Sequence, residues 1–524
     1  MNLKYQAVSS SEWLYPDVSA YATASATMAC HAARGGYLTA QVRLAGLEGG
    51  CLPLSCAMKG AAAAFAAEFY EMVPVFVGEQ AFQTEPEGCC PNRATPFYVY
   101  DCLKPLGETC QAMDGVVGLY LSAKVPRDCA PGDYEGSLQV RCGGAALDIP
   151  VAFTVHKAVL PGETLKFTNW YNPHAVAQHH NAEMGSEEYK RLDLLYHQMM
   201  RRSHQNMLRV DGGIEVREAG KNQYEFDFTQ FEGYVRAALA LGFTYFQMPA
   251  IGGRKSWRES TIYVYGGKLP CLSYEGYAYL SQYLGGLGAV LRRNGWMDRF
   301  YLSISDEPND ANAVEYRALC GMARRLLPGV KLFDAMSHGP FYGSLDVYVP
   351  LNAEYEAYQA EFERFRAGGD ELWHYVCCMP RGGGYVNRFL DYPLLTTRYL
   401  FWGNYKYGLT GYLHWALNQY QPGQDPFKDN WPEHHNADSV CFLPPGDTHV
   451  VYPGQGAPWM SMRLEAQRES AEEYELLRAL AAKDKAAADA ICAKCFRGFS
   501  DVEHDPVAFD AVRIELMEAL GGCD

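Results

Sequence analysis

The first part of the chain, up to about residue 158, consists of short alternating or β-branched runs that are broken by Gly and Pro. Examples are GGYLTAQVRL, VPVFVG, TPFYVYDCL, GVVGLYLSAKVP and GDYEGSLQVRC. Strands of this kind at regular intervals are typical of an antiparallel β-sandwich. The one interruption is the Ala-rich stretch AMKGAAAAFAAEFY, which predicts a short helix or a loop.

After Leu160-Pro161-Gly162 the pattern changes to alternating strands and helices. The predicted strands cover residues 165–171, 206–212, 244–250, 299–308, 331–338, 345–352, 371–380 and 409–418. Segments such as EEYKRLDLLYHQMMRRSH lie between most of them and repeat apolar residues at helical spacing. Eight such units predict a (β/α)8 TIM barrel, with a link between the fifth and sixth strands that is too short for a full helix. A doubly wound open sheet is the alternative, but no GxGxxG follows the first strand.

Three further helices are predicted over 460–482, 483–492 and 506–520. We therefore predict an N-terminal β-sandwich domain over 1–160, a catalytic barrel over 161–482 and a small helical C-terminal extension over 483–524.

Composition narrows the class of protein. The 524 residues are 48% hydrophobic and 20% charged, and no apolar run approaches the roughly 18 to 20 residues that cross a bilayer, which excludes an integral membrane protein. The net charge of -16, without a basic stripe, argues against a nucleic-acid partner. Aromatic residues make up 13%, and such rings serve sugar-binding clefts as well as ordinary cores.

The N-terminus and the cysteines bear on the cellular compartment. MNLKYQAVSSSEWLYPD lacks the basic start and apolar segment of a secretory signal, and the 17 cysteines follow no framework spacing. We expect reduced thiols and a cytoplasmic location, although a trimmed secretory chain would begin in the same way. The lone CxxC of Cys492 and Cys495 has no second pair, so we predict neither a metal site nor a cofactor.

In a barrel the reactive groups come from the C-terminal ends of the strands. The polar or aromatic residues at these ends are Asn172, His174, Asp211, Gln247, Asp306, Glu307, Ser337, His338, Asn352, Glu354, Tyr375, His414, Trp415 and Asn418. Only the fourth strand, RFYLSISDEP, ends in two adjacent carboxylates. Neighbouring side chains of a strand point to opposite faces, so Asp306 and Glu307 converge on one ligand only if the backbone leaves strand geometry there. Pro308 supplies a plausible break, and the alternative is that Asp306 or Asp310 caps the next helix.

Two nearby acids suit glycoside hydrolysis, in which one protonates the leaving oxygen and negative charge supports the transition state. The usual nucleophilic carboxylate is missing, because the seventh strand, ELWHYVCCMP, has no Asp or Glu at its C-terminal end. A 2-acetamido group on the substrate can replace that nucleophile intramolecularly. Asp306 would then orient and stabilise the acetamido group, and Glu307 would act as general acid and base. Glu354 remains a possible conventional nucleophile, or else begins the helix AEYEAYQAEFERF.

Several segments together resemble glycoside hydrolase family 123. They are the Asp306-Glu307-Pro308 strand end, LWHYVCCMPRGGGYVNRFLD, GYLHWALNQY and GDTHVVYPGQGAPWMSMRLEAQRESAEEYELL, and CHAARGGYLTAQVRL and APGDYEGSLQVRC are similar to that family's leading β-sandwich. The resemblance implies a retaining β-N-acetylgalactosaminidase that works by substrate assistance on a glycan or glycoconjugate, with Asp306 and Glu307 in the roles above. Two features depart from the family pattern, RESAEEYE where an RDG-EDYE-like run is expected and Ala416 in place of a glycine.

The resemblance also implies a set of substrate-binding residues, which are Trp373, Tyr375, Tyr412, His414, Trp415 and Asn418. Each could equally serve barrel packing, and Trp415 is the strongest candidate for stacking under the sugar. Arg463 matches a recurrent family position, either as a substrate contact or in an internal ion pair with Glu465 or another barrel acid. Two other functions stay open: a barrel glycosidase without a 2-acetamido requirement, and an inactive carbohydrate-binding protein. The sequence leaves galacto and gluco specificity undecided.

Overall fold

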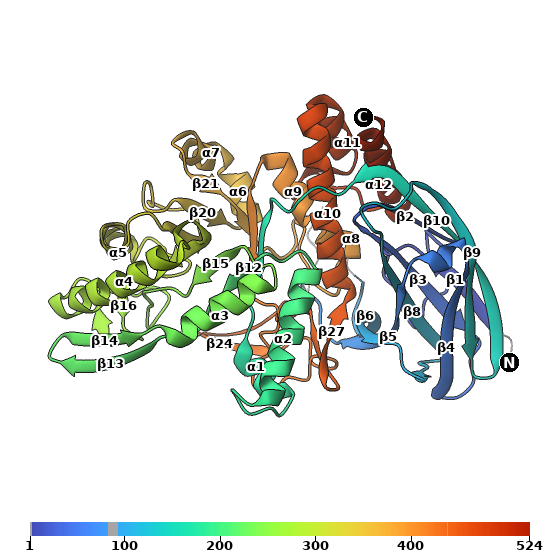
Figure 1. The fold of residues 1–524 in the computed structure, drawn as a ribbon, viewed down its shortest axis with the longest axis horizontal. Coiled ribbons are helices and arrows are strands. Elements are labelled where there is room, and N and C mark those ends of the chain that lie inside the picture. Colours follow the sequence, from blue (N-terminus) through green and yellow to red (C-terminus); the bar gives the residue numbers. More distant parts are fainter. Residues whose placement is uncertain (1–2, 82–92, 437–438, 524) are drawn as a thin grey trace.

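The computed structural model describes residues 3–81, 93–436 and 439–523. Its N-terminal part is two facing β-sheets, with strand orders β1-β3-β8-β5-β6-β27-β26 and β2-β10-β9-β4-β7 (Figure 1). All neighbouring strands in the two sheets are antiparallel except β2 and β10. The strands are β1 (Lys4–Val8), β2 (Met28–Arg34), β3 (Tyr37–Ala45), β4 (Cys51–Gly60), β5 (Ala67–Val77), β6 (Phe97–Pro105), β7 (Thr109–Gln111), β8 (Val116–Lys124), β9 (Gly132–Cys142), β10 (Ala145–Val159), β26 (Tyr452–Gly454) and β27 (Ala457–Ser461). Only Ala61–Ala64 of the Ala-rich stretch is helical, as a 3-10 turn, and its flanks belong to β4 and β5.

The alternating apolar residues of the N-terminal strands form the core between the two sheets. Inward-facing side chains of both sheets, among them Leu38, Val42, Leu119 and Phe153, form one buried apolar cluster. Strands β3, β8 and β10 each give alternate residues to this cluster, which is why the period of two is visible in the sequence.

The following part is an α/β region with parallel strands. The strands are β11 (Lys166–Asn169), β12 (Met207–Arg209), β15 (Tyr245–Met248), β18 (Phe300–Ser303), β19 (Lys331–Met336), β20 (Val347–Pro350), β21 (Glu371–Leu372), β22 (His374–Tyr375) and β23 (Gly411–His414). They form two parallel sheets, β12-β15-β18-β19-β20-β21 and β11-β23-β22. All eight predicted strand regions therefore contain parallel strand, and the seventh is divided between the two sheets at Trp373.

The parallel strands do not form one continuous closed ladder, in contrast to the prediction. Within the described residues no backbone pairing joins β11 to β12. The side-chain amide of Asn206 bridges the gap instead: its Oδ1 accepts from the Phe167 backbone N–H at 3.1 Å, and its Nδ2 donates to the Leu165 carbonyl at 2.9 Å. Asn206 is buried, so its amide supplies partners that the backbone of β12 does not offer β11.

The helices that accompany these strands are α1 (Pro173–His179), α2 (Glu187–Arg202), α3 (Thr229–Ala240), α4 (Tyr274–Asn294), α5 (Ala313–Leu326), α6 (Asn352–Ala357), α7 (Gln359–Ala367), α8 (Leu394–Arg398) and α9 (Leu400–Tyr407), with a 3-10 turn at Met297–Arg299. Helix α4 shows the usual sequence signals for the start and the end of a helix. The hydroxyl of Ser273 accepts from the Gly276 N–H at the start of α4, and Gly295 ends that helix in the left-handed conformation. No helix lies between β19 and β20, as the short link predicted.

The remaining elements are short hairpins and the C-terminal helices. The hairpins are β13 (Glu215–Gly220) with β14 (Gln223–Asp227), β16 (Tyr263–Val264) with β17 (Leu269–Pro270), β24 (Glu433–Asn436) with β25 (Ser439–Phe442), and β28 (Phe496–Gly498) with β29 (Asp501–Val502). The helices are α10 (Met462–Lys483), α11 (Lys485–Cys495) and α12 (Pro506–Gly522). No helix in the described chain is long and apolar enough to cross a membrane.

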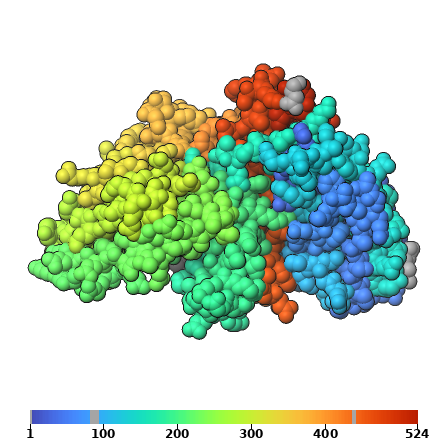
Figure 2. All heavy atoms as spheres, viewed as in Figure 1, coloured from blue at the N-terminus to red at the C-terminus, as the bar shows by residue number. Residues whose placement is uncertain are grey.

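Helix α10 stands between the N-terminal sheets and the parallel strands (Figure 1), and Figure 2 shows these two parts packed against each other. The preceding strand β27 pairs with β6, so the chain enters α10 directly from the N-terminal sheet. Nearly all of α10 is buried despite its many charged residues. A helix with charges on all sides is stable in such a place only if those charges are paired.

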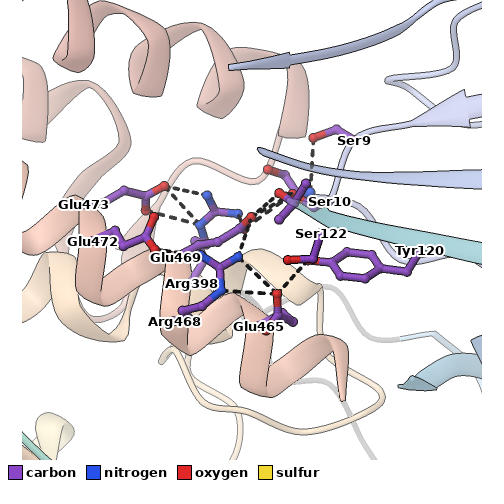
Figure 3. A network of polar contacts seen from close by, with 12 residues as sticks. Ser9, Ser10, Tyr120, Ser122, Arg398, Glu465, Arg468, Glu469, Glu472 and Glu473 are labelled. Carbon is purple, nitrogen blue, oxygen red and sulfur yellow. Dashed lines mark hydrogen bonds and ion pairs between the residues drawn. The ribbon is translucent and has the colours of Figure 1, made fainter. Parts of the chain in front are cut away.

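Figure 3 shows the pairing of these charges. Arg468 contacts three glutamates of its own helix, Glu465, Glu469 and Glu472. Arg398 of α8 reaches Glu469 and Glu473. From the N-terminal part, Tyr120 of β8 donates to Glu465 at 2.9 Å, and Ser10, just after β1, donates to Glu469 at 3.3 Å. The network thus joins both parts of the protein through α10.

Candidate active site

Asp306 and Glu307 follow β18 and form a sharp backbone corner. Their φ angles are 55° and 39°, in the left-handed region that non-glycine residues rarely adopt. The backbone therefore leaves strand geometry where the sequence analysis required it, and both side chains enter the same cavity. Such strain costs about 1 to 3 kcal/mol per residue and persists only where surrounding contacts hold it.

The neighbouring strand β19 supplies those contacts. The buried carboxylate of Asp334 accepts the backbone N–H groups of Ile304 at 3.2 Å, Ser305 at 2.9 Å and Asp306 at 3.3 Å, as well as the Tyr316 hydroxyl at 2.9 Å. The Glu307 N–H donates to the Ala335 carbonyl at 2.9 Å. Four consecutive N–H groups of the corner are thus bonded to two adjacent residues of β19.

The cavity above this corner has a volume of about 680 Å³, within the roughly 300 to 1,000 Å³ that is usual for small-molecule sites. Its wall comes from the loops that follow several parallel strands. The lining residues are Trp170, Arg254, Ser256, Trp257, Ser305, Asp306, Glu307, Ala335, Tyr375, Cys377, Cys378, Leu413, Trp415, His434, Cys441 and Leu443. Asp306 and Glu307 are the only carboxylates among these described residues.

The two carboxyl groups have raised pKa values. Burial is the main cause for both, since the protein walls replace much of the bulk water around them even though Asp306 is open to the cavity. The charges of Glu307 and Asp334 raise the pKa of Asp306 further. Tyr375 donates to Glu307 Oε1 at 2.5 Å, which works in the opposite direction by stabilising the ionised form. The two carboxyl groups therefore titrate as a pair, because a charge on Glu307 hinders the ionisation of Asp306.

Two of the predicted binding residues line this cavity. Tyr375 of β22 contacts Glu307, as described above. Trp415, just after β23, is half-buried, and its Nε1 donates to the buried carboxylate of Asp447 at 3.2 Å. This bond fixes one edge of the indole, while the ring forms part of the cavity wall.

The other predicted residues lie in packed surroundings outside the lining. Trp373 packs against Tyr301 and Phe333 inside the parallel strands. Tyr412 packs against other buried rings, His414 lies 3.2 Å from Asp447, and the Asn418 amide donates to the Asn172 carbonyl. Their contact with a sugar stays a prediction.

Arg463 is fully buried and forms an ion pair with Asp101 of β6 at 2.9 Å. Its alternative partner, Glu465, instead contacts Arg202 and Arg468. The sequence could not indicate Asp101, because that residue comes from the N-terminal sheet.

Glu354, the candidate conventional nucleophile, lies in α6 outside the cavity lining. Its Oε2 accepts the His338 backbone N–H at 2.7 Å. Burial raises the pKa of its carboxyl group, and the charge of Glu307 adds to this effect. The contact with His338 is that of a carboxylate holding a loop against a helix start.

Comparison with known proteins adds to this geometry. The catalytic-domain model of glycoside hydrolase 123 matches residues 170–480, more than half of the chain. The chain belongs to glycoside hydrolase family 123. The match covers the acid corner, the cavity and most of α10. No curated protein sequence matches the chain.

A solved structure of the same family has the fold of this family 123 enzyme. A family 123 glycoside hydrolase from Clostridium perfringens, studied for glycolipid glycan hydrolysis, aligns with a TM-score of 0.76 at 13% identity, over 99% of this chain and 98% of that one. A β-galactosidase from Marinomonas ef1 reaches a TM-score of only 0.38 at 11% identity, over 63% of this chain and 62% of that one. The first match covers both the N-terminal sheets and the α/β region, and the second is too weak to support an argument.

Sequence reasoning missed several functional candidates of this family 123 enzyme. Asp334 lies inside a strand, where a lone acid in KLFDAMSH gives no signal of the corner that it holds. Trp170 directly follows β11 and lines the cavity, but an aromatic residue at a strand end is as common in a core as in a site. Arg254 and Trp257 belong to a loop without a motif, so only the folded chain brings them to the cavity.

Proposed function

We propose that this enzyme is a retaining exo-glycosidase that removes terminal β-linked N-acetylgalactosamine, with the 2-acetamido group of the substrate as the nucleophile. The observation that carries the proposal is the cavity wall, where the described residues include two adjacent carboxylates and no third. A conventional retaining enzyme needs a second carboxylate about 5 Å across the sugar from its acid. Neighbours in sequence at one corner are better suited to act together on one side of the substrate.

In this proposal Glu307 protonates the leaving oxygen and later removes a proton from water. Its raised pKa supports the acid role, because a proton must be present near neutral pH. Asp306 accepts the acetamido N–H and stabilises the positive charge of the cyclic oxazolinium ion. Donation from that N–H would favour the ionised form of Asp306 once substrate is bound. Trp415 offers a ring face for the sugar.

We also infer that the parallel strands are those of a (β/α)8 barrel with a seam between β11 and β12, in a catalytic domain over 161–482. The order of the strands supports this, since β22 and β23 lead back to β11. The substrate class, a glycan or glycoconjugate, follows from the family and agrees with the glycolipid glycan hydrolysis of the C. perfringens relative.

A panel of 4-nitrophenyl β-glycosides tests the specificity. We expect hydrolysis of the N-acetylgalactosaminide and inhibition by a galacto-configured thiazoline, which mimics the oxazolinium ion. Hydrolysis of β-galactoside or β-glucoside without activity on 2-acetamido sugars would overturn substrate assistance.

The two acids can be distinguished by leaving group. Glu307→Gln should slow substrates with poor leaving groups far more than activated aryl glycosides, because the latter need little protonation. Asp306→Asn should lower the rate on acetamido substrates by about 10² to 10³-fold or more, since it removes charge stabilisation of the transition state. Asp310→Asn is the matched control, because that exposed acid lies close in sequence but outside the cavity lining. Equal loss on both kinds of substrate for Glu307→Gln would contradict the acid assignment.

A further inference from the structure

A second cavity, with a volume of about 650 Å³, lies along the exposed side of helix α5. It shares no lining residue with the cavity above the acids. One wall is α5 itself, from Ala313 to Arg324, and the other is formed by residues 340 and 342–344 of the link between β19 and β20. We call this cavity the α5 groove. Helix α5 lies at the end of the α/β region that is far from the N-terminal sheets (Figure 1).

The link between β19 and β20 is fixed against α5. The ring of Phe341 packs edge-on against Tyr316, with 5.5 Å between the ring centres. Arg324 Nη2 donates to the Ser344 carbonyl at 3.1 Å, and the Ser344 N–H donates to the Tyr348 hydroxyl at 3.2 Å. The groove therefore exists before any ligand arrives, so little order would have to be gained on binding.

An exposed aromatic ring is held in place in this groove. Tyr342 has 53% of its surface accessible. Its hydroxyl donates to Glu361 of α7 at 2.6 Å, and its ring contacts Phe365 edge-on, with 5.4 Å between the ring centres. A fixed ring that is open to solvent can take the apolar C–H face of a pyranose.

The charge of the groove is positive. Its lining contains two arginines and, among the described residues, no Asp or Glu. Arg324 is paired with Asp346 at 2.5 Å, whereas the exposed Arg317 has no ion-pair or hydrogen-bond partner in the part of the chain that the structure describes. A guanidinium can hold a carboxylate by two parallel hydrogen bonds. The groove is therefore suited to a ligand with an anionic group.

The wall of the groove also contains an unpaired polar atom. Ser344 is only 5% exposed, and its Oγ has no hydrogen-bond partner among the described residues. A buried hydroxyl without a partner costs free energy, and a hydroxyl group of a ligand would supply that partner. A lipid tail or an aliphatic side chain would leave the cost in place, so this atom favours a polar ligand.

We propose that the α5 groove is a binding site for an acidic sugar, whose carboxylate pairs with Arg317 and whose pyranose face lies on the ring of Tyr342. The site binds its sugar without cleaving it, because it contains no acid and lies apart from the catalytic cavity. The inference does not rest on the proposed function, since it concerns a different ligand at a different place.

Methyl β-glucuronide and methyl β-glucoside test the proposal as a matched pair, because they differ only in a carboxylate that replaces a hydroxymethyl group. Saturation-transfer NMR titrations with the wild-type enzyme measure both dissociation constants. We expect a Kd of about 1 mM for the glucuronide and binding of the glucoside that is about fivefold weaker. Raising NaCl from about 50 mM to about 500 mM should weaken only the glucuronide.

Substitutions assign the contacts. Arg317→Gln should weaken glucuronide binding about fivefold and leave glucoside binding unchanged. Tyr342→Ala should weaken glucuronide binding about tenfold, and Tyr342→Phe should retain most of it because the ring remains. Arg325→Gln is the matched control, since it removes an exposed arginine of the same helix that lies outside the groove lining, and it should change neither sugar.

Several results would overturn the site. They are no binding of either sugar, equal affinity for both, and equal weakening by Arg317→Gln and Arg325→Gln in variants with unchanged melting temperatures. Displacement of the glucuronide by inorganic phosphate at the same ionic strength would show an anion site without sugar recognition. Trp415→Ala alters the catalytic cavity and should leave glucuronide binding unchanged. Loss of binding in that variant would place the sugar in the catalytic cavity instead.

Discussion

Asp334 holds the acid corner, and two substitutions can distinguish the effect of its hydrogen-bond acceptor from the effect of its charge. Asp334→Asn keeps an oxygen that can occupy the position of Oδ2, which accepts from Ser305, Asp306 and Tyr316. Asp334→Ala removes the acceptor from these donors and from the Ile304 N–H. The first variant should preserve the corner, and the second should release it.

The structure sets the size of both effects. In the Ala variant four buried donors lose their acceptor, and at about 1 to 3 kcal/mol each the loss of stability is about 4 kcal/mol or more. In the wild type, burial raises the pKa of Asp334 from 3.8 to about 7. The pKa of Asp334 is higher in the folded state than in the unfolded state. Its contribution to the free energy of unfolding is therefore complete below pH 3.8 and is lost as the pH rises to about 7. About two of these pH units lie above pH 5, and at about 1.4 kcal/mol per unit they amount to about 3 kcal/mol.

Urea unfolding of wild type and Asp334→Asn at pH 5 and pH 8 measures this contribution. Asn does not titrate, so the free energy of unfolding of the variant relative to wild type should increase by about 3 kcal/mol between the two pH values. The same difference at both pH values would refute a buried, titrating Asp334.

Activity gives a second measurement of the same group. The negative charge of Asp334 raises the pKa of Asp306, so Asp334→Asn should move the acidic limb of the kcat/KM profile to lower pH, by about one unit. A residue with only a structural role would lower the rate without moving the limb. Asp334→Ala should lose most activity because the corner is no longer held.

Three further predictions concern contacts that fix the site and the fold. Tyr375→Phe removes the hydrogen bond that stabilises ionised Glu307, so the pKa of that acid should rise. The alkaline limb of the kcat/KM profile should then move up by about one pH unit. An unchanged limb would show that Glu307 is not the group that titrates there. Asn206→Ala leaves the Phe167 N–H of β11 and the carbonyl of the preceding Leu165 without partners, and it should lower the free energy of unfolding by about 2 to 4 kcal/mol in urea titrations. A loss below about 0.5 kcal/mol would show that the seam does not depend on this amide. Arg398→Met leaves the carboxylates of Glu469 and Glu473 without their main partner and should cost about 3 to 5 kcal/mol, with a smaller loss in the triple variant that also replaces both glutamates by Gln; a triple variant as unstable as the single one would contradict uncompensated charge as the cause.

The predictable parts of the fold were those that depend on local periodicity. Alternation marked the strands of the N-terminal sheets, and helical spacing separated the eight parallel strand regions. The helix predicted over 460–482 is α10, Met462–Lys483. The sequence did not indicate that β27 would pair with β6, because this pairing joins residues more than 350 positions apart. The division of the seventh strand at Trp373 was also hidden, since it reflects pairing with two different neighbours.

The candidate site also has one part that the sequence predicts and another that only the folded chain decides. Asp306, Glu307 and the break at Pro308 are adjacent in the chain, so the sequence by itself determined the acid pair, its place after the fourth strand and the family. Only the tertiary structure decided what surrounds the pair: the carboxylate of Asp334 beneath it, the Tyr375 hydroxyl on Glu307, and Trp257 at the mouth. The physical reason is that hydrogen bonds, burial and the resulting pKa values arise between segments that meet only on folding, and no local pattern encodes which segments will meet.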